Sequence, residues 1–297
     1  MKISGGEIIM NLRRNIGVSQ EELAKKLFIS QQKLSRIEAG DQELDIMEFV
    51  VAFGSFGFPI DDFWVMHLNY DEFQGYVQYR KIRRLLRYGK IDEIREIFPL
   101  ISENPLMQRS FMSQFFSYIR VIVDEKATDA NKTEMLFDVL KLTIADFDDG
   151  KIKEYRFSYS EILILNEIAL QYAKAGENER AIYLLTEIVE NWDNFRITMA
   201  EENILLSKLL TDLYNFLVAA EEYEKASVLC EQVLEQCRRT YNYHFVPHAT
   251  YILGLCNHKM GKSSKEYMPL IRRAYHTARG IEQHTLANKI KEEYDVS

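Results

Sequence analysis

The chain has 297 residues, of which 47% are hydrophobic and 28% are charged, so it is neither intrinsically disordered nor collagen-like. Its 37 Lys and Arg against 45 Asp and Glu give a net charge of −8. That charge disfavours a chain coated in nucleic acid, but it leaves room for a local basic surface. With only 13 Gly and 5 Pro, few connections need special backbone geometry.

Helical spacing of apolar residues dominates the chain, and no run alternates with period two. The sequence therefore predicts an all-α fold, and the length allows about two domains. Most glycines fall where the helical rhythm stops and restarts, which predicts helix-to-helix turns at Gly17, Gly40, Gly57, Gly89, Gly150, Gly176, Gly261 and Gly280.

The strongest local pattern lies at residues 19–40. Ser19 followed by Glu22 is a capping box that starts one short helix, and Ser30 starts the next. If Leu34 and Ile37 of the second helix face inward, its outward residues are Gln31, Gln32, Lys33, Ser35 and Arg36.

These outward side chains suit the reading of DNA in the major groove. Glutamine offers a donor and an acceptor to adenine, and arginine binds guanine with two parallel hydrogen bonds. A helix that carries such residues near its N-terminus is the element that enters the groove. The alternative for a Ser- and Gln-rich hairpin is a solvated surface helix.

Residues 4–66 resemble the helix-turn-helix of the phage-repressor or Xre type. The resemblance includes Arg13 and the closing Glu38-Ala39-Gly40, and it implies that Arg13 and Glu38 pair to hold the domain together. It also implies that Ser19 and Gln20 contact the phosphate backbone of DNA and that Gln31, Gln32 and Arg36 contact its bases. The expected DNA-contacting set is Ser19, Gln20, Ser30, Gln31, Gln32, Lys33, Ser35 and Arg36.

Charge divides this segment into two parts. Residues 1–40 carry a net charge of +3, whereas residues 41–66 carry six acids and no base. A positive field this weak predicts modest affinity for one domain and a need for two copies.

A change of character at residues 59–72 marks a domain boundary. We expect a five-helix DNA-binding domain at residues 1–66, a linker at 67–72 and a second domain at 73–297. After the linker comes a basic run that includes Arg80, Arg84 and Lys90. This run is suited to bind DNA, a ligand carboxylate or the acidic segment of the first domain. The alternative is a solvated helix face without a partner.

The second domain contains a weak internal repeat. Ala169, Tyr172, Gly176 and Ala181 have the offsets of a helical hairpin. A second copy runs from Tyr214 through Leu217, Glu221 and Tyr223 to Ala226, and a third contains Ala249, Gly254, Leu255 and Gly261. The copies resemble tetratricopeptide repeats, which implies a right-handed superhelix of hairpins with a concave groove. An irregular helical bundle is the alternative.

An Xre-type domain joined to tetratricopeptide-like repeats resembles the Rgg/PlcR group of peptide-pheromone receptors. The resemblance implies a homodimeric quorum-sensing transcription regulator, which binds a pseudo-palindromic DNA operator and a short signalling peptide. Related arrays place a peptide-clasping asparagine where this chain has Asn166. Lys208, Thr211 and Asn215 occupy comparable offsets, and Lys208 suits a peptide carboxylate. For all four, a solvated helix position is the alternative.

Other chemistry has little support in the sequence. Cys230, Cys237 and Cys256 do not form a Cys-x-x-Cys motif, and the histidines lack the spacing of a zinc site. We therefore expect no metal, no cofactor and no enzymatic activity. Without an apolar leader or an 18-residue apolar run, the chain is expected to be cytoplasmic and not to contact membranes.

Two other functions stay open at this stage. The first alternative is a transcription regulator whose repeats bind a protein partner or only dimerise. The second is a tetratricopeptide adaptor without DNA-reading function.

Overall fold

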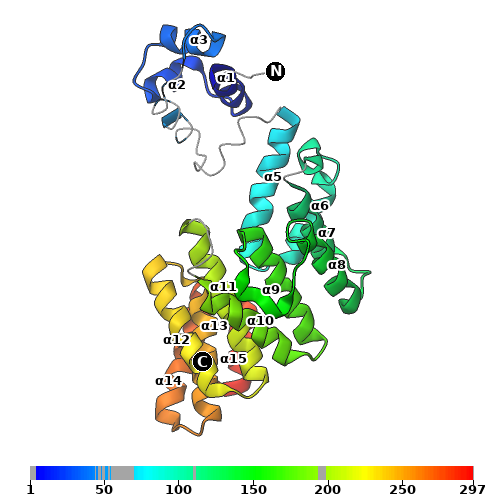
Figure 1. Cartoon of the computed structure of the whole chain (residues 1–297). Coiled ribbons are helices and arrows are strands. Elements are labelled where there is room, and N and C mark those ends of the chain that lie inside the picture. The colour runs from blue at the N-terminus through cyan, green and yellow to red at the C-terminus, as the bar shows by residue number, and fades with distance from the viewer. Residues whose placement is uncertain are drawn as a thin grey trace. The chain divides into compact units, whose positions relative to one another are not determined.

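The computed structural model describes residues 5–43, 45, 48, 51, 52, 54, 70–109, 112–192 and 199–296, with the backbone alone at 199–203. The chain divides into two compact units, residues 1–113 and 114–297. Within the described ranges the regular elements are α-helices and short 3-10 helices, without a strand (Figure 1). This confirms the predicted all-α fold.

The N-terminal segment contains α1 (Gly5–Asn15), α2 (Gln20–Lys26) and α3 (Gln31–Ala39). The side chains of Ser19 and Ser30 cap α2 and α3 by accepting hydrogen bonds from the third residue beyond each, as predicted. The core beneath these helices includes Ile9, Leu23 and Leu34. The remaining two of the five predicted helices fall in residues that are largely outside the described ranges.

Close approach of two helices fixes α1 on α3. A Cβ atom at Gly6 would lie 1.6 Å from the carbonyl oxygen of Ile37. Only glycine fits there, because no larger side chain leaves room for the α3 backbone. A Cβ atom at Gly5, one residue earlier, would have no atom of the described residues within 4 Å.

The rest of the first unit contains α5 (Tyr70–Arg87), α6 (Ile91–Ile101) and the 3-10 helix η2 (Pro105–Gln108). Because α5 begins at Tyr70, the last three residues of the predicted linker are helical. Glu72 in its first turn is buried and accepts two hydrogen bonds from Arg109, at 2.6 and 2.7 Å. The predicted domain limits otherwise stay a prediction.

The second unit is a succession of helices that pack on their neighbours in chain order (Figure 1). Its N-terminal part contains α7 (Ser113–Val123), α8 (Asp129–Lys141), the 3-10 helix η4 (Asp149–Glu154), α9 (Tyr159–Lys174) and α10 (Asn178–Glu190). Its C-terminal part contains α11 (Met199–Ala219), α12 (Tyr223–Thr240), η6 (Tyr243–Phe245), α13 (Val246–Lys259), α14 (Ser264–Gly280) and α15 (His284–Tyr294).

The three predicted repeat copies are the hairpins α9–α10, α11–α12 and α13–α14. Small residues lie where their helices meet: Ala169, Ala181 and Ala226 are fully buried. At Gly254, a Cβ atom would lie 2.7 Å from Ile271 of the facing helix α14. The predicted right-handed winding of the array stays a prediction.

Each hairpin turn contains a left-handed residue. Gly176 and Gly261 adopt φ of 83° and 76°, as the glycine pattern predicts, and Glu221 takes the same role with φ 60°. After α14 the prediction was wrong by two residues. Gly280 is the last helical residue, and Glu282 adopts φ 62°. Gly57 lies outside the described residues.

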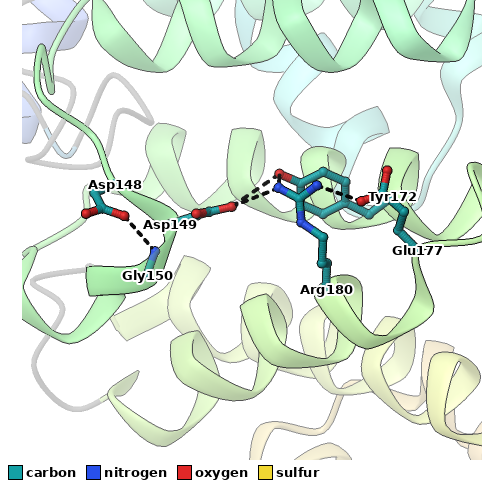
Figure 2. Close-up of polar contacts among 6 residues, drawn as sticks. All are labelled: Asp148, Asp149, Gly150, Tyr172, Glu177 and Arg180. Carbon is teal, nitrogen blue, oxygen red and sulfur yellow. Dashed lines mark hydrogen bonds and ion pairs between the residues drawn. The ribbon is translucent and has the colours of Figure 1, made fainter.

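A cluster of polar contacts holds the connector before α9 against the first hairpin (Figure 2). The Arg180 guanidinium lies over the Tyr172 ring, 4.1 Å from its centroid, and donates hydrogen bonds to Asp149 at 3.1 Å and Glu177 at 2.6 Å. Burial raises the Tyr172 pKa to about 12, although Arg180 opposes that shift. The cluster therefore attaches η4 to α9 and α10.

The described helices include none with the length and apolar character needed to cross a membrane.

Candidate functional site

The outward face of α3 is solvent-exposed and polar. Gln31, Gln32, Ser35 and Arg36 are exposed, whereas Leu34 and Ile37 are fully buried. The four exposed side chains make no hydrogen bond or ion pair within the described part of the chain. Their donors and acceptors are therefore available to a ligand. This orientation of α3 agrees with the pattern read from the sequence, while the DNA contacts themselves stay a prediction.

A buried ion pair holds α3 in place. Arg13 donates to both carboxylate oxygens of Glu38, at 2.7 and 2.8 Å, and to the carbonyl of Val18 at 2.9 Å. Gln20 adds a hydrogen bond to Glu38 at 2.8 Å. Burial opposes ionisation of Glu38, but the hydrogen bonds from Arg13 and Gln20 outweigh it and lower the Glu38 pKa. The pairing expected for Arg13 and Glu38 is present.

Four members of the predicted DNA-contacting set have partners inside the protein. Lys33 was expected to face outward, but its ammonium lies 2.5 Å from the Glu48 carboxylate and its side chain is half-buried. Gln20 binds Glu38, and Ser19 and Ser30 accept backbone hydrogen bonds as helix caps. A DNA contact by any of these four would share or replace an existing interaction.

In the second unit, the predicted peptide-contacting residues lie in and around a polar cluster of α9 and α11. Asn166 donates its amide hydrogen to the Asp212 carboxylate at 2.9 Å, and Lys208 binds the same oxygen at 2.8 Å. Asn166 is only 2% exposed, so the solvated alternative is wrong for this residue. Its side-chain oxygen is buried and has no hydrogen-bond partner among the residues that the structure describes.

The other two predicted residues contribute less to this cluster. Thr211 donates its hydroxyl to the Ser207 carbonyl of its own helix, at 2.7 Å. Asn215 lies one turn further along α11 and is half-buried. Neither binds Asn166 or Asp212 directly. Lys208 and Asn215 share one face of α11 with Asp212 because they lie four and three positions from it.

Sequence reasoning missed Asp212. The available signal was its position four residues after Lys208, the spacing of a helical ion pair. Asp212 joins two residues that were selected separately, since a single carboxylate oxygen accepts from both Asn166 and Lys208.

A partly buried histidine lies on the next hairpin. The Tyr214 hydroxyl is 2.6 Å from His248 Nδ1, and the two rings stack with centroids 5.6 Å apart. Burial, helped by the positive charge of Lys289, lowers the His248 pKa to about 4. His248 is therefore neutral at physiological pH. Sequence reasoning considered it only among the histidines that lack the spacing of a zinc site, so its packing against Tyr214 was not predicted.

No set of three His, Cys, Asp or Glu side chains in the described ranges is arranged to hold a metal ion. All three cysteines are buried and free of disulfides, and burial raises the pKa of each thiol. The thiols therefore pack as small apolar groups.

Comparison with protein families identifies the N-terminal segment. Residues 9–62 match the family model described as Helix-turn-helix. This segment is a helix-turn-helix domain. Within it, α2 and α3 are the two helices that the sequence pattern selected. No curated protein matches the chain.

Solved structures resemble nearly the whole chain. PlcR of Bacillus thuringiensis, in complex with the peptide PapR7 and DNA, has a TM-score of 0.71 and 18% identity, covering 97% of this chain and 99% of PlcR. ComR of Streptococcus thermophilus, with DNA and its signalling peptide ComS, has a TM-score of 0.55 and 16% identity, covering 98% of each chain. The SHP pheromone receptor Rgg2 of Streptococcus dysgalactiae has a TM-score of 0.53 and 16% identity, covering 98% of this chain and 99% of Rgg2.

These likenesses give the chain the fold of PlcR, ComR and Rgg2, a helix-turn-helix domain followed by helical repeats. The resemblance to the Rgg/PlcR group that the sequence suggested is therefore present at the level of fold.

Proposed function

We propose that the protein is a DNA-binding transcription regulator controlled by a short peptide that binds the repeat domain. The observation that carries the proposal is the polar face of α3 in a helix-turn-helix domain, which is exposed and has no partner within the described ranges. A polar helix face of this kind supplies both hydrogen bonds to base edges and contacts to phosphates. The likeness to three solved peptide-responsive regulators supports the second half of the proposal.

We assign the DNA contacts according to whether each side chain already has a partner within the protein. Gln31, Gln32 and Arg36 are the residues for base recognition, and Ser35 suits a phosphate. Ser19, Gln20, Ser30 and Lys33 are assigned to the phosphate backbone, where partial sharing of an existing hydrogen bond suffices. Two recognition helices of a homodimer would contact a pseudo-palindromic operator. Because one of the proposed partners is DNA, we place the protein in the cytoplasm.

In the repeat domain, Asn166 is the central peptide contact, and Asp212 determines how it binds. An ionised carboxylate only accepts hydrogen bonds, so the Asn166 amide nitrogen must face Asp212. The Asn166 oxygen is then left without a partner among the described residues, and the backbone N–H of an extended peptide would reach this buried oxygen once the side chains that cover it move aside. Lys208, Thr211 and Asn215 lie on the adjacent helix, and Lys208 would have to release Asp212 to take a peptide carboxylate.

Footprinting on the protein's own promoter tests the DNA half. Changing Gln31, Gln32 and Arg36 together to alanine should abolish the footprint while the helical circular dichroism stays unchanged. Changing Arg238 and Arg239 on α12 to alanine is the matched control, and the footprint should persist. A footprint that survives the triple change would contradict base recognition by α3, and the absence of a footprint with the wild-type chain would support the adaptor function without DNA reading.

Calorimetry with short synthetic peptides tests the other half. The peptides are those encoded by small open reading frames beside the gene, and one should bind the wild-type chain but bind Asn166→Ala at least about tenfold more weakly. If none binds, the repeat domain serves a protein partner or dimerisation alone.

A further inference from the structure

The charge of the second unit is strongly uneven. Residues 114–257 carry 14 Lys and Arg against 24 Asp and Glu, whereas residues 258–291 carry eight against two. A segment with a net charge of +6 thus follows one with a net charge of −10. The proposed function assigns no role to this basic C-terminal region.

The basic residues form a line on α14. Lys265, Arg272, His276 and Arg279 are all exposed and recur at the spacing of one helix face, with Arg273 beside them. From the first to the last, the line is about 21 Å long at 1.5 Å per residue. The opposite face, with Ile271, Ala274 and Ala278, is buried, and α14 packs against α13 and α15.

On some other helices, exposed basic residues have acidic partners on their own helix. Arg238 and Arg239 both bind Glu235, and Arg95 binds Asp92. On α14, by contrast, Lys265, Arg272 and Arg273 have no ion pair or hydrogen bond from their side chains within the described residues. The only acid of this helix, Glu266, is bound to Ser263 at the N-cap.

We propose that the exposed face of α14 is a docking surface for an acidic segment of a partner protein. Unpaired cations that repeat over several turns of one helix match a line of carboxylates on a helix or strand of similar length. This role is independent of the peptide and DNA contacts assigned above.

The surrounding charge favours a protein segment over the other polyanions. A DNA duplex is wider than one helix, so it would bring phosphates within a Debye length of the acidic remainder of the unit. A helix that lies in a membrane interface buries large apolar side chains beside its cations, and α14 exposes none. Self-pairing of α14 across a two-fold axis would oppose like charges.

Fluorescence anisotropy with labelled poly-L-glutamate of about 20 residues tests the proposal on the full chain. Arg272→Glu with Arg273→Glu should weaken binding about tenfold or more at low salt. The matched control, Arg238→Glu with Arg239→Glu, makes the same charge change on another exposed helix and should leave the affinity within about twofold.

Three results would overturn the proposal. One is an equal loss in both double variants, which would indicate a net-charge effect. The second is tighter, α14-dependent binding of a random duplex of about 20 base pairs, which would assign the face to nucleic acid. The third is concentration-dependent self-association that disappears in the Arg272 and Arg273 variant, because the occupant would then be a second copy of this chain. Circular dichroism of each variant separates these results from misfolding.

Discussion

The outward face of α3 and the cluster around Asn166 are both polar, but the first is exposed to solvent and the second is largely buried. On α3 the side chains of Gln31, Gln32 and Arg36 are exposed and have no partner among the described residues, and the buried Arg13–Glu38 pair supports the helix from below. Around Asn166 the polar groups are largely buried and bound to one another, except for the Asn166 side-chain oxygen, which has no partner among the described residues. An exposed face costs little to keep ready for a ligand, whereas a buried cluster needs every group satisfied. The comparison predicts that changes on the two surfaces differ in their effects on stability.

The largest expected effect removes the support of the exposed face. Gly6→Ala places a methyl group 1.6 Å from the Ile37 carbonyl oxygen, so α1 and α3 must separate. We expect a loss of about 3 kcal/mol in the stability of the helix-turn-helix domain. Hydrogen exchange of the α1 and α3 amides measures it. Gly5→Ala is the control, and equal protection in the two variants would disprove the close contact.

The second effect is a loss of stability at low pH, which we expect from the largely buried His248. The folded-state pKa of His248, about 4, lies below the usual 6.5, so the unfolded chain binds the proton more readily. Stability is fully present above pH 6.5 and falls as the pH drops toward 4, by up to about 3 kcal/mol. Urea denaturation at several pH values measures the slope.

His248→Gln should flatten this slope. A wild-type slope in the His248 variant would assign the acid sensitivity to other groups.

The third effect compares two ion pairs with the same helical spacing. Asp212→Ala leaves Lys208 and Asn166 without their acceptor in a cluster whose charged side chains are at most 20% exposed, and we expect a cost of about 2 kcal/mol. Glu21→Ala breaks the Lys25–Glu21 pair, whose side chains are 75% and 65% exposed, and should change stability much less. Thermal unfolding measures both. Equal costs would mean that burial does not distinguish the two surfaces.

The smallest expected effect is an increase in stability. Phe28, in the turn between α2 and α3, adopts φ 56° and is 94% exposed. Glycine takes this conformation without the steric cost of a Cβ atom, so Phe28→Gly should stabilise the chain by about 1 kcal/mol. Glu221→Gly, at φ 60° in the second hairpin, should give a similar gain. A destabilised Phe28 variant in urea denaturation would mean that the phenyl ring has a folded-state contact.

The same comparison explains what the sequence could predict. Surface helices follow from local patterns, so the caps at Ser19 and Ser30 and the buried Leu34 and Ile37 were all predictable. Gly176 and Gly261 were predictable as turns because left-handed backbone favours glycine.

Contacts between distant residues were not predictable in this way. Lys33 has its partner at Glu48, and Asn166 has its partner 46 residues later in Asp212. Those contacts depend on how helices pack and not on local spacing. Glu282 was missed for a different reason: it is a non-glycine residue in the left-handed turn that ends α14, where the Gln283 N–H bonds the Ala278 carbonyl at 2.9 Å.

The most direct test of the central claim is the peptide dependence of operator affinity. Fluorescence anisotropy with the footprinted promoter fragment, titrated with the binding peptide, measures it for the wild-type chain and for Asn166→Ala. The account predicts that the peptide changes wild-type operator affinity at least about fivefold, and that Asn166→Ala binds the operator normally without responding at the same peptide concentration. An operator affinity that the peptide leaves unchanged in the wild-type chain would contradict the coupling of the two domains.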